Sequence, residues 1–146
     1  MLSKISIRRL IHGSPDYEAA VSLRRRILRT PLGLDFTPEQ LAAEADDTHL
    51  AAFDGDDIVA TVVLSPYDDA TLKLRQMAVD PTLHGQSVGS QLLRAAEDLA
   101  RADGRTRIVL AARVTAEGFY HRHGYAREGD IFTEVTIPHV RMVKSL

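Results

Sequence analysis

A short glycine-rich segment near the middle of the sequence has the clearest chemical potential. Residues His84-Gly85-Gln86-Ser87-Val88-Gly89-Ser90 follow an apolar stretch and precede a run with helical periodicity. Small residues there leave the first backbone N–H groups of the helix uncovered, and the helix dipole adds partial positive charge, so the segment could bind a pyrophosphate. It is neither a P-loop nor a dinucleotide fingerprint, because Gly-Lys-Ser/Thr and Gly-x-Gly-x-x-Gly are both absent. A tight structural turn is the alternative.

The same glycine-rich segment is also compatible with a second kind of chemistry. Gly85-Gln86-Ser87-Val88-Gly89 also reads Gly-x-Ser-x-Gly, the nucleophile elbow of serine hydrolases. His139 follows it in the chain, with Asp130 or Glu134 between, so an order of serine, acid and histidine can be written. Against this hypothesis, the chain is short for that fold and residues 80–84 separate the apolar stretch from the first glycine, whereas an elbow turns sharply off a strand. No His-Gly-Gly-type oxyanion loop precedes it.

The composition narrows the function classes. The chain has 146 residues, a formal net charge of −2 and no cysteine, which argues against a nucleic-acid binder and excludes disulfides, thiolate metal sites and a cysteine nucleophile. No metal site is expected. The basic run at residues 24–26, with Arg29, is interpreted as a solvated helix face. The longest apolar run, Ile58 to Leu64, is too short to span a bilayer and the first ten residues do not resemble a signal peptide, so a cytoplasmic protein without membrane contact is predicted.

Periodicity and turn residues predict one domain, residues 1–146, with the element order β-α-α-β-β-β-α-β-α-β-β. The predicted strands cover about residues 4–11, 49–53, 58–64, 71–79, 107–112, 125–135 and 139–143. The predicted helices cover about residues 15–28, a short segment after a capping box at Thr37 and Gln40, 88–102, and 115–123. The sequence shows no repeat and no linker. A mixed α/β fold follows.

Two segments in the right order resemble the GNAT superfamily of N-acetyltransferases. The segment Gln76 to Gly89 is similar to motif A of that family, in which a strand leads into a Gln/Arg-x-x-Gly-x-Gly/Ala loop. His84 stands where Gln or Arg is usual, and Ser87 stands where the first glycine is usual. Downstream, Ala116 to Tyr125 resembles the family's Ala-x-x-Phe-Tyr-x-x-x-Gly-Phe/Tyr segment, and the ending Ile137 to Met142 resembles a small bacterial branch of predicted acyltransferases.

The resemblance implies a fold, a co-substrate and a reaction. The fold would be a central, mostly antiparallel twisted sheet flanked by about four helices. The co-substrate would be acetyl-CoA, used without a metal, and the acetyl group would pass directly to the amine of a small molecule through a tetrahedral intermediate. The strand would bind the pantetheine arm and offer an N–H to the thioester carbonyl, and the loop would hold the pyrophosphate. The residues assigned to coenzyme binding are Met77, Ala78, Val79, His84, Gly85, Gln86, Ser87, Val88, Gly89 and Ser90.

The resemblance also assigns proton-transfer roles. Tyr120 matches the family's general-acid tyrosine, and a phenol stays protonated at neutral pH and can donate to a departing thiolate. Glu134 and His139 fall near the expected acceptor cleft and are the candidate bases, with Glu44 and His49 as weaker ones. A packing role for Tyr120 and surface positions for Glu134 and His139 are the alternatives.

Several properties stay open in the sequence. The acceptor, the acyl group beyond acetyl, and the base are not specified by any residue pattern. C-terminal strands of such domains often pair, so a homodimer is an open alternative to a monomer. A non-catalytic acyl-CoA-binding module is the third functional hypothesis, beside the transferase and the hydrolase.

Overall fold

A computed structural model describes residues 5–84 and 87–146 and contains one eight-stranded sheet. The strands are β1 (Ile5–Leu10), β2 (Thr48–Asp54), β3 (Asp57–Pro66), β4 (Thr71–Val79), β5 (Arg107–Arg113), β6 (Ala126–Arg127), β7 (Phe132–Glu134) and β8 (Ile137–Ser145). The α-helices are α1 (Pro15–Arg24), α2 (Pro38–Ala42), α3 (Val88–Ala102) and α4 (Glu117–Arg122). A π-helix, η1 (Arg25–Arg29), and three single-turn 3₁₀ helices, η2 (Thr30–Leu32), η3 (Pro81–Leu83) and η4 (Val114–Ala116), complete the chain. The predicted mixed α/β class with a mostly antiparallel sheet is confirmed.

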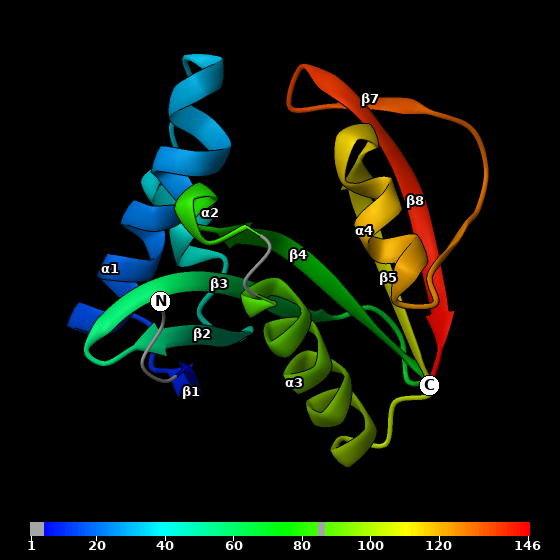
Figure 1. Ribbon diagram of the computed structural model, residues 1–146, viewed down its shortest axis with the longest axis horizontal. Helices are drawn as coiled ribbons and strands as arrows, with labels where there is room; N and C mark the ends of the chain where they lie inside the picture. The colour runs from blue at the N-terminus through cyan, green and yellow to red at the C-terminus, as the bar shows by residue number, and fades with distance from the viewer. Residues whose placement is uncertain (1–4, 85–86) are drawn as a thin grey trace.

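The sheet opens in its middle. The strand order is β1-β2-β3-β4-β5-β8-β6, with β7 on β8, and β4 and β5 form the parallel pair. Their ladder joins only residues 71–74 of β4 to residues 107–110 of β5. Beyond Leu74 and Leu110 the two strands diverge, and Figure 1 shows them close together near the C-terminus of the chain and far apart at their other ends. The sheet therefore has a gap at its centre that side chains from both halves can line.

Alternating residues place helices on both faces of the N-terminal half. Leu50 and Ala52 of β2 belong to the main core cluster with Leu92 and Leu93 of α3. Their neighbours in the strand point the other way, because successive side chains of a strand alternate between faces, and Ala51 and Phe53 cluster with Ala20 of α1. Helices α3 and α1 therefore cover opposite faces of the same strands. Tyr120 of α4 belongs to the same cluster as α3.

The first helix is shorter than the sequence predicts. Ser14 caps α1 through its side chain, which accepts a hydrogen bond from the Tyr17 N–H at 3.2 Å, and the predicted capping box between Thr37 and Gln40 is present at α2. The predicted helix through residue 28 instead changes to the π-helix η1 after Arg24. A π-helix places one extra residue in a turn, often at functional sites, and Leu28 and Arg29 at its end line the gap between β4 and β5.

The C-terminal strands also differ from the prediction. The predicted strand over residues 125–135 is divided into β6 and β7, and Gly129 between them adopts a left-handed conformation with φ 86°, which departs from the extended backbone of a strand. Strand β8 runs further in both directions than predicted and includes Pro138. Among the described residues, no helix is both long and apolar enough to cross a membrane.

Candidate active site

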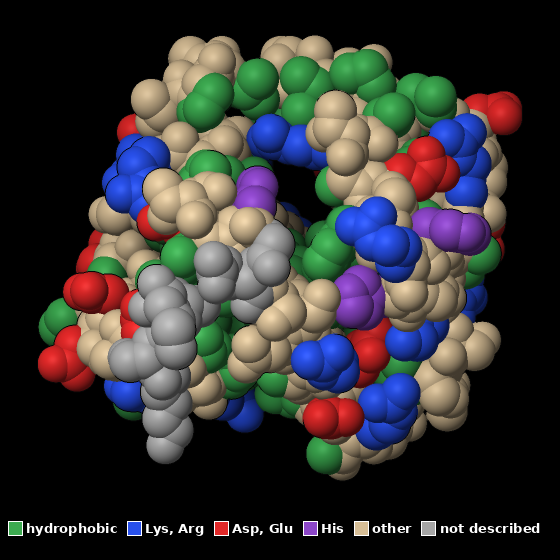
Figure 2. All heavy atoms as spheres, viewed as in Figure 1, with side chains coloured by type: hydrophobic (Ala, Val, Ile, Leu, Met, Phe, Trp, Pro, Cys, Tyr) green, Lys and Arg blue, Asp and Glu red, His purple; other side chains and the backbone are tan. Residues whose placement is uncertain are grey.

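A cleft of about 770 Å³ lies where β4 and β5 separate. Its walls come from β4, from the start of α3 and from α4, and Figure 2 shows a hollow on this face with Lys or Arg and His side chains at its edge. The predicted coenzyme-binding residues that line the cleft are Met77, Ala78, Val79, His84, Ser87, Val88, Gly89 and Ser90. Gly85 and Gln86 lie outside the described residues. The structure thus brings the described part of the predicted set to one cleft.

Strand β4 offers its backbone to this cleft. One edge of β4 is paired with β3, where Thr61 lies opposite Ala78 and Ala60 opposite Val79. Within the described residues, the other edge has a ladder partner only as far as Leu74. Unpaired N–H and C=O groups on an edge form hydrogen bonds with an extended ligand as another strand would. The geometry therefore suits an extended arm with amide groups.

The start of α3 forms the neighbouring wall. Ser87 precedes the helix in a left-handed conformation, with φ 57°, which glycine adopts at less cost than serine. A Cβ atom on Gly89 would lie 3.4 Å from the Phe119 ring and from Val79, so the helix starts close against both neighbours. Helix α3 is fifteen residues long, and the positive end of its dipole at this wall favours the binding of an anion.

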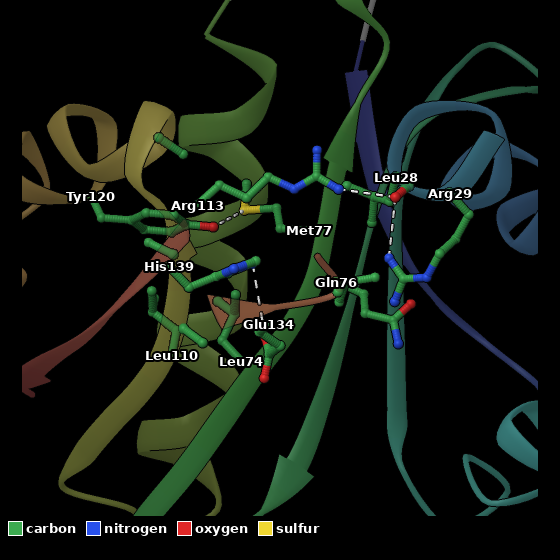
Figure 3. Close-up of a pocket in the computed structure, with 14 residues that line it drawn as sticks. Leu28, Arg29, Leu74, Gln76, Met77, Leu110, Arg113, Tyr120, Glu134 and His139 are labelled. Carbon is green, nitrogen blue, oxygen red and sulfur yellow. Dashed lines mark hydrogen bonds and ion pairs between the residues drawn. The ribbon is translucent and has the colours of Figure 1, made fainter. Parts of the chain in front are cut away.

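A second, smaller cavity of about 130 Å³ adjoins the cleft (Figure 3). Both spaces are lined by Leu28, Met77, Arg113, Ala116 and Tyr120, which therefore form their common boundary. The smaller cavity alone is lined by Arg29, Gln76, Glu134 and His139 among others. The arrangement resembles two substrate spaces that meet at a shared wall.

Tyr120 stands at this boundary. Its side chain is 8% exposed, and its hydroxyl lies 3.6 Å from the Met77 sulfur in a weak contact (Figure 3). Burial raises the pKa of Tyr120 well above its usual value, because a phenolate loses its hydration in an apolar site. The hydroxyl is therefore protonated at neutral pH and can donate a hydrogen bond to either space.

His139 and Glu134 come from the hairpin of β7 and β8 and both line the smaller cavity. His139 is 5% exposed, and its Nδ1 lies 2.9 Å from the carbonyl oxygen of Ile137. A carbonyl only accepts, so Nδ1 carries the hydrogen and Nε2 of the neutral ring keeps its lone pair. That Nε2 atom lies 3.8 Å from a carboxylate oxygen of Glu134, which is 49% exposed. The pair can accept a proton at Nε2 and stabilise the resulting charge.

Comparison with known proteins decides the family. The family model for GNAT acetyltransferases matches residues 17–125, more than half of the chain and all of the cleft from β4 to α4. The chain belongs to the GNAT acetyltransferase family. The resemblance of the two sequence segments to that family is thereby confirmed.

Individual relatives agree with this assignment. A Xenopus tropicalis protein named "Probable N-acetyltransferase 14" is 36% identical over 84 residues, which are 55% of this chain and 41% of that protein; the chain thus matches about two-fifths of that relative's length. A Lactobacillus plantarum crystal structure assigned as an N-acetyltransferase superposes with a TM-score of 0.84 at 25% identity, covering 97% of this chain and 98% of that one. A GNAT structure from Elizabethkingia anophelis with acetyl-CoA bound has a TM-score of 0.75 at 18% identity, covering 99% of both chains.

Several residues predicted for other chemistry lie apart. Ser87 lines the large cleft, whereas His139 and Glu134 line the small cavity, and η3 intervenes between the end of β4 and the serine. The structure therefore does not assemble the serine, acid and histidine of a hydrolase in this GNAT domain. Glu44 and His49, the weaker base candidates, line neither space. The carboxylate of Glu44 instead binds Arg24 and Tyr17.

The interpretation of the basic run as a solvated helix face is wrong for Arg24, which is 1% exposed and paired with Glu44 at 3.0 Å. Arg29 lines the small cavity. The prediction assumed one continuous α-helix, whereas the change to η1 after Arg24 alters the direction in which the later side chains point. Among the described residues, no group of three or more His, Asp or Glu side chains could hold a metal ion.

Four residues at the site had no role predicted for them there. Arg29, Gln76 and Arg113 line the small cavity, and His123 lies 2.9 Å from the Ser90 hydroxyl beside the cleft. A polar residue at the carboxyl end of β5, where two strands of an α/β sheet separate, is a recognisable signal for Arg113. No sequence pattern indicates that Gln76 has a positive φ or that Arg29 turns toward the small cavity.

Proposed function

We propose that this GNAT domain transfers an acetyl group from acetyl-CoA directly to the amine of a small molecule. Family membership supports an acyl-CoA-dependent N-acyltransferase. The acetyl group, the small-molecule acceptor and the roles of individual residues are the content of the proposal. The observation that carries it is the shared boundary at Met77 and Tyr120 between a large cleft and a small cavity.

The large cleft fits the coenzyme. Its volume of about 770 Å³ lies within the range of about 300–1,000 Å³ typical of cofactor sites. The unpaired edge of β4 at Met77 to Val79 would bind the pantetheine arm, and the start of α3 would hold the pyrophosphate near Ser87 and Gly89. An N–H of β4 would bind the thioester carbonyl and stabilise negative charge on its oxygen.

Tyr120 would act as the general acid. Its hydroxyl reaches the boundary where the thioester sulfur would lie, beside Met77. Burial raises the pKa of the phenol, and the same apolar surroundings raise the proton affinity of a departing thiolate. The phenol therefore holds its proton until negative charge forms next to it, and then donates it.

His139 would act as the base. Its Nδ1–H bond to Ile137 leaves Nε2 free to accept a proton, and Glu134 at 3.8 Å would stabilise the imidazolium. Because Glu134 is half exposed, it connects the buried imidazole with solvent. His139 and Glu134, which the sequence offers as separate candidates, would thus work as a pair.

Calorimetric titration of acetyl-CoA into the purified protein tests the coenzyme site. We expect saturable one-site binding that Gly89→Trp abolishes, because a side chain at Gly89 must project past Phe119 and Val79 into the cleft. Ala102→Trp is the matched control, since Ala102 lies exposed at the far end of the same helix. Thermal melts of both variants verify that they fold.

The outcome separates the three hypotheses. Binding that only Gly89→Trp loses, together with acetylation of amines, supports the transferase. Binding without turnover of any amine supports a non-catalytic module. Absence of binding at millimolar acetyl-CoA would overturn the proposal, and ester hydrolysis would then be the next assay.

A further inference from the structure

Two arginines converge on one carbonyl oxygen in the small cavity. Arg113, at the end of β5, donates from Nη2 to the Leu28 carbonyl at 2.9 Å. Arg29, at the end of η1, donates from Nη1 to the same oxygen at 3.2 Å. Figure 3 shows the two guanidinium groups approaching this oxygen from different elements. A single neutral acceptor therefore holds two positive charges together.

Neither arginine has a carboxylate partner. Among the ion pairs of the described residues, none includes Arg29 or Arg113, whereas Arg24, Arg25 and Arg26 on the same helical segment each have one. Burial lowers the pKa of both Arg29 and Arg113, and the neighbouring Arg113 charge lowers that of Arg29 further. Both stay charged at neutral pH. A guanidinium presents five donors in a planar fork that suits a carboxylate, so the two arginines can bind an anion for which the described residues provide no ion-pair partner.

A third polar group faces the same cavity without a partner. The side-chain oxygen of Gln76 is buried and has no hydrogen-bond partner among the described residues, and Gln76 lines the cavity. Its backbone has φ 52°, which a non-glycine residue adopts at a cost. A buried polar atom without a partner costs free energy unless a ligand or water satisfies it. Gln76 therefore adds a polar side chain to the cavity wall, and its oxygen could bind a ligand once the amide turns toward it.

The β7–β8 hairpin gives the cavity the complementary chemistry. Glu134 and the Nε2 lone pair of His139 lie on this hairpin, and Glu134 also attracts the Arg29 charge without forming an ion pair with it. An ammonium or amine suits Glu134 and His139, and an anion suits the two arginines. One small molecule that carries both groups would match both sets.

We propose that the acceptor is a compact amino acid, whose carboxylate binds Arg29 and Arg113 and whose amine faces His139 and Tyr120. This rests on the proposed function. The cavity of about 130 Å³ is close to one of roughly 150 Å³ that binds benzene, so it encloses on the order of six to eight non-hydrogen atoms, the size of alanine or serine. In the reaction, the amine nitrogen forms the bond to the acetyl carbon, the carbon–sulfur bond breaks, His139 takes the amine proton and Tyr120 gives its proton to the sulfur.

Matched acceptors isolate the carboxylate. The first series is L-alanine, L-alaninamide, ethylamine and 1-aminoethylphosphonate, and the second is L-serine, L-serinamide and ethanolamine. We expect kcat/KM for the amino acids to exceed that for their amides and decarboxylated amines by about 100-fold, because a site built to bind a charged group rejects analogues that leave it unpaired. Calorimetry of the same compounds with the protein saturated in coenzyme A gives a binding readout that does not depend on turnover.

Arg29→Gln separates acceptor recognition from the coenzyme site. Arg29 lines the small cavity and not the large cleft, so we expect KM for L-alanine to rise about 10–100-fold and the preference for L-alanine over ethylamine to fall, while acetyl-CoA affinity stays the same. Arg26→Gln is the matched control, since Arg26 is 65% exposed, pairs with Asp80 and lines neither space.

The outcomes distinguish the proposed carboxylate site from the proposed transferase function on which it rests. Amides or decarboxylated amines that react as well as the amino acids would overturn the carboxylate site and leave the transferase standing. A preference for the phosphonate would assign the arginines to a phosphate-bearing amine and also overturn it. Acetyl-CoA binding without binding or acetylation of any compound in either series would exclude compact amino acids. Failure to bind acetyl-CoA would instead refute the proposed function itself.

Discussion

Two groups of charged and polar side chains, one at each end of η1, differ in whether the described residues supply a counter-ion. In the first, which we name the closed cluster, Glu44 accepts hydrogen bonds from both Nη atoms of Arg24 at 3.0–3.1 Å and from Tyr17 at 2.9 Å, and His49 binds the Glu44 carbonyl at 2.9 Å. In the second, the open cluster, Arg29, Arg113 and Gln76 share a cavity without a carboxylate bound to either arginine.

This difference indicates where charged side chains are available to bind a ligand. Arg24 and Arg29 are five residues apart on one helical segment, yet within the described part of the chain an ion pair forms at Arg24 and none forms at Arg29. Among the described residues, the non-glycine positions with positive φ are Gln76, Ser87, Val135 and Thr136. Three of them line the cleft or the cavity and the fourth adjoins Val135. At the small cavity, the strained backbone of Gln76 and Val135 thus coincides with two arginines that lack a carboxylate partner among the described residues, and backbone strain is typical of functional sites.

The largest effect is expected from breaking the closed cluster. Glu44→Gln leaves the guanidinium of Arg24 buried without a counter-ion and should lower the free energy of unfolding by about 3–5 kcal/mol. Urea denaturation measures this, with Glu39→Gln on the exposed first turn of α2 as control. Acetyl-CoA affinity should not change. A variant of normal stability that binds acceptor poorly would mean that Glu44 belongs to the open cluster.

Removing the hydroxyl of Tyr120 should slow catalysis and leave the packing of the aromatic ring unchanged. Tyr120→Phe should lower kcat about 100-fold or more, with little change in melting temperature, because the hydroxyl makes only a weak contact with Met77. Tyr125→Phe is the matched control. Its buried hydroxyl donates to Glu97 at 2.9 Å, so that variant should lose about 1.5–3 kcal/mol of stability and keep its kcat. Unchanged turnover in Tyr120→Phe would remove Tyr120 from the mechanism.

The sequence predicted the elements that local rules govern. The apolar runs of β2 and β3 on either side of a turn, the capping box at Thr37 and the helical spacing of α3 each depend on a few neighbouring residues, and the structure contains all of them. Most residues predicted to bind the coenzyme share one cleft, because β4, η3 and α3 follow one another in the chain. Their role in coenzyme binding stays a prediction.

The open cluster depends on contacts between segments far apart in the chain. Arg113 reaches the carbonyl of Leu28 across 85 positions, and the π-helix that turns Arg29 toward it has no signature among the residues of η1. The division of the predicted strand 125–135 depends on the conformation of Gly129, which a glycine permits without requiring. Buried ion pairs such as Arg24–Glu44 likewise depend on how α1 packs against the turn that follows α2.

The turn between β7 and β8 lies beside the open cluster and allows the backbone strain there to be measured. Glu134 pairs with Ile137, so Val135 and Thr136 form a two-residue turn with φ 50° and 67°, where Asn-Gly is preferred. Thr136→Gly should stabilise the protein by about 1 kcal/mol, because a β-branched residue with positive φ costs roughly 1–2 kcal/mol. The matched control Thr133→Gly, within β7, should destabilise it by roughly 0.5–1 kcal/mol. Equal melting shifts in both would show that the turn stores no strain.

The smallest effect concerns Ser87, at the other strained position. With φ 57° before α3, Ser87→Gly should stabilise by about 0.5–1 kcal/mol, the cost of a left-handed serine less the entropy of glycine. Acetyl-CoA should bind as well or better, because the loop keeps its backbone donors. Ser90→Gly inside the helix should instead destabilise, since it also removes the contact with His123. If Ser87→Gly kept coenzyme binding but lost all turnover, the serine would be a nucleophile, and direct transfer to the amine would give way to a covalent route.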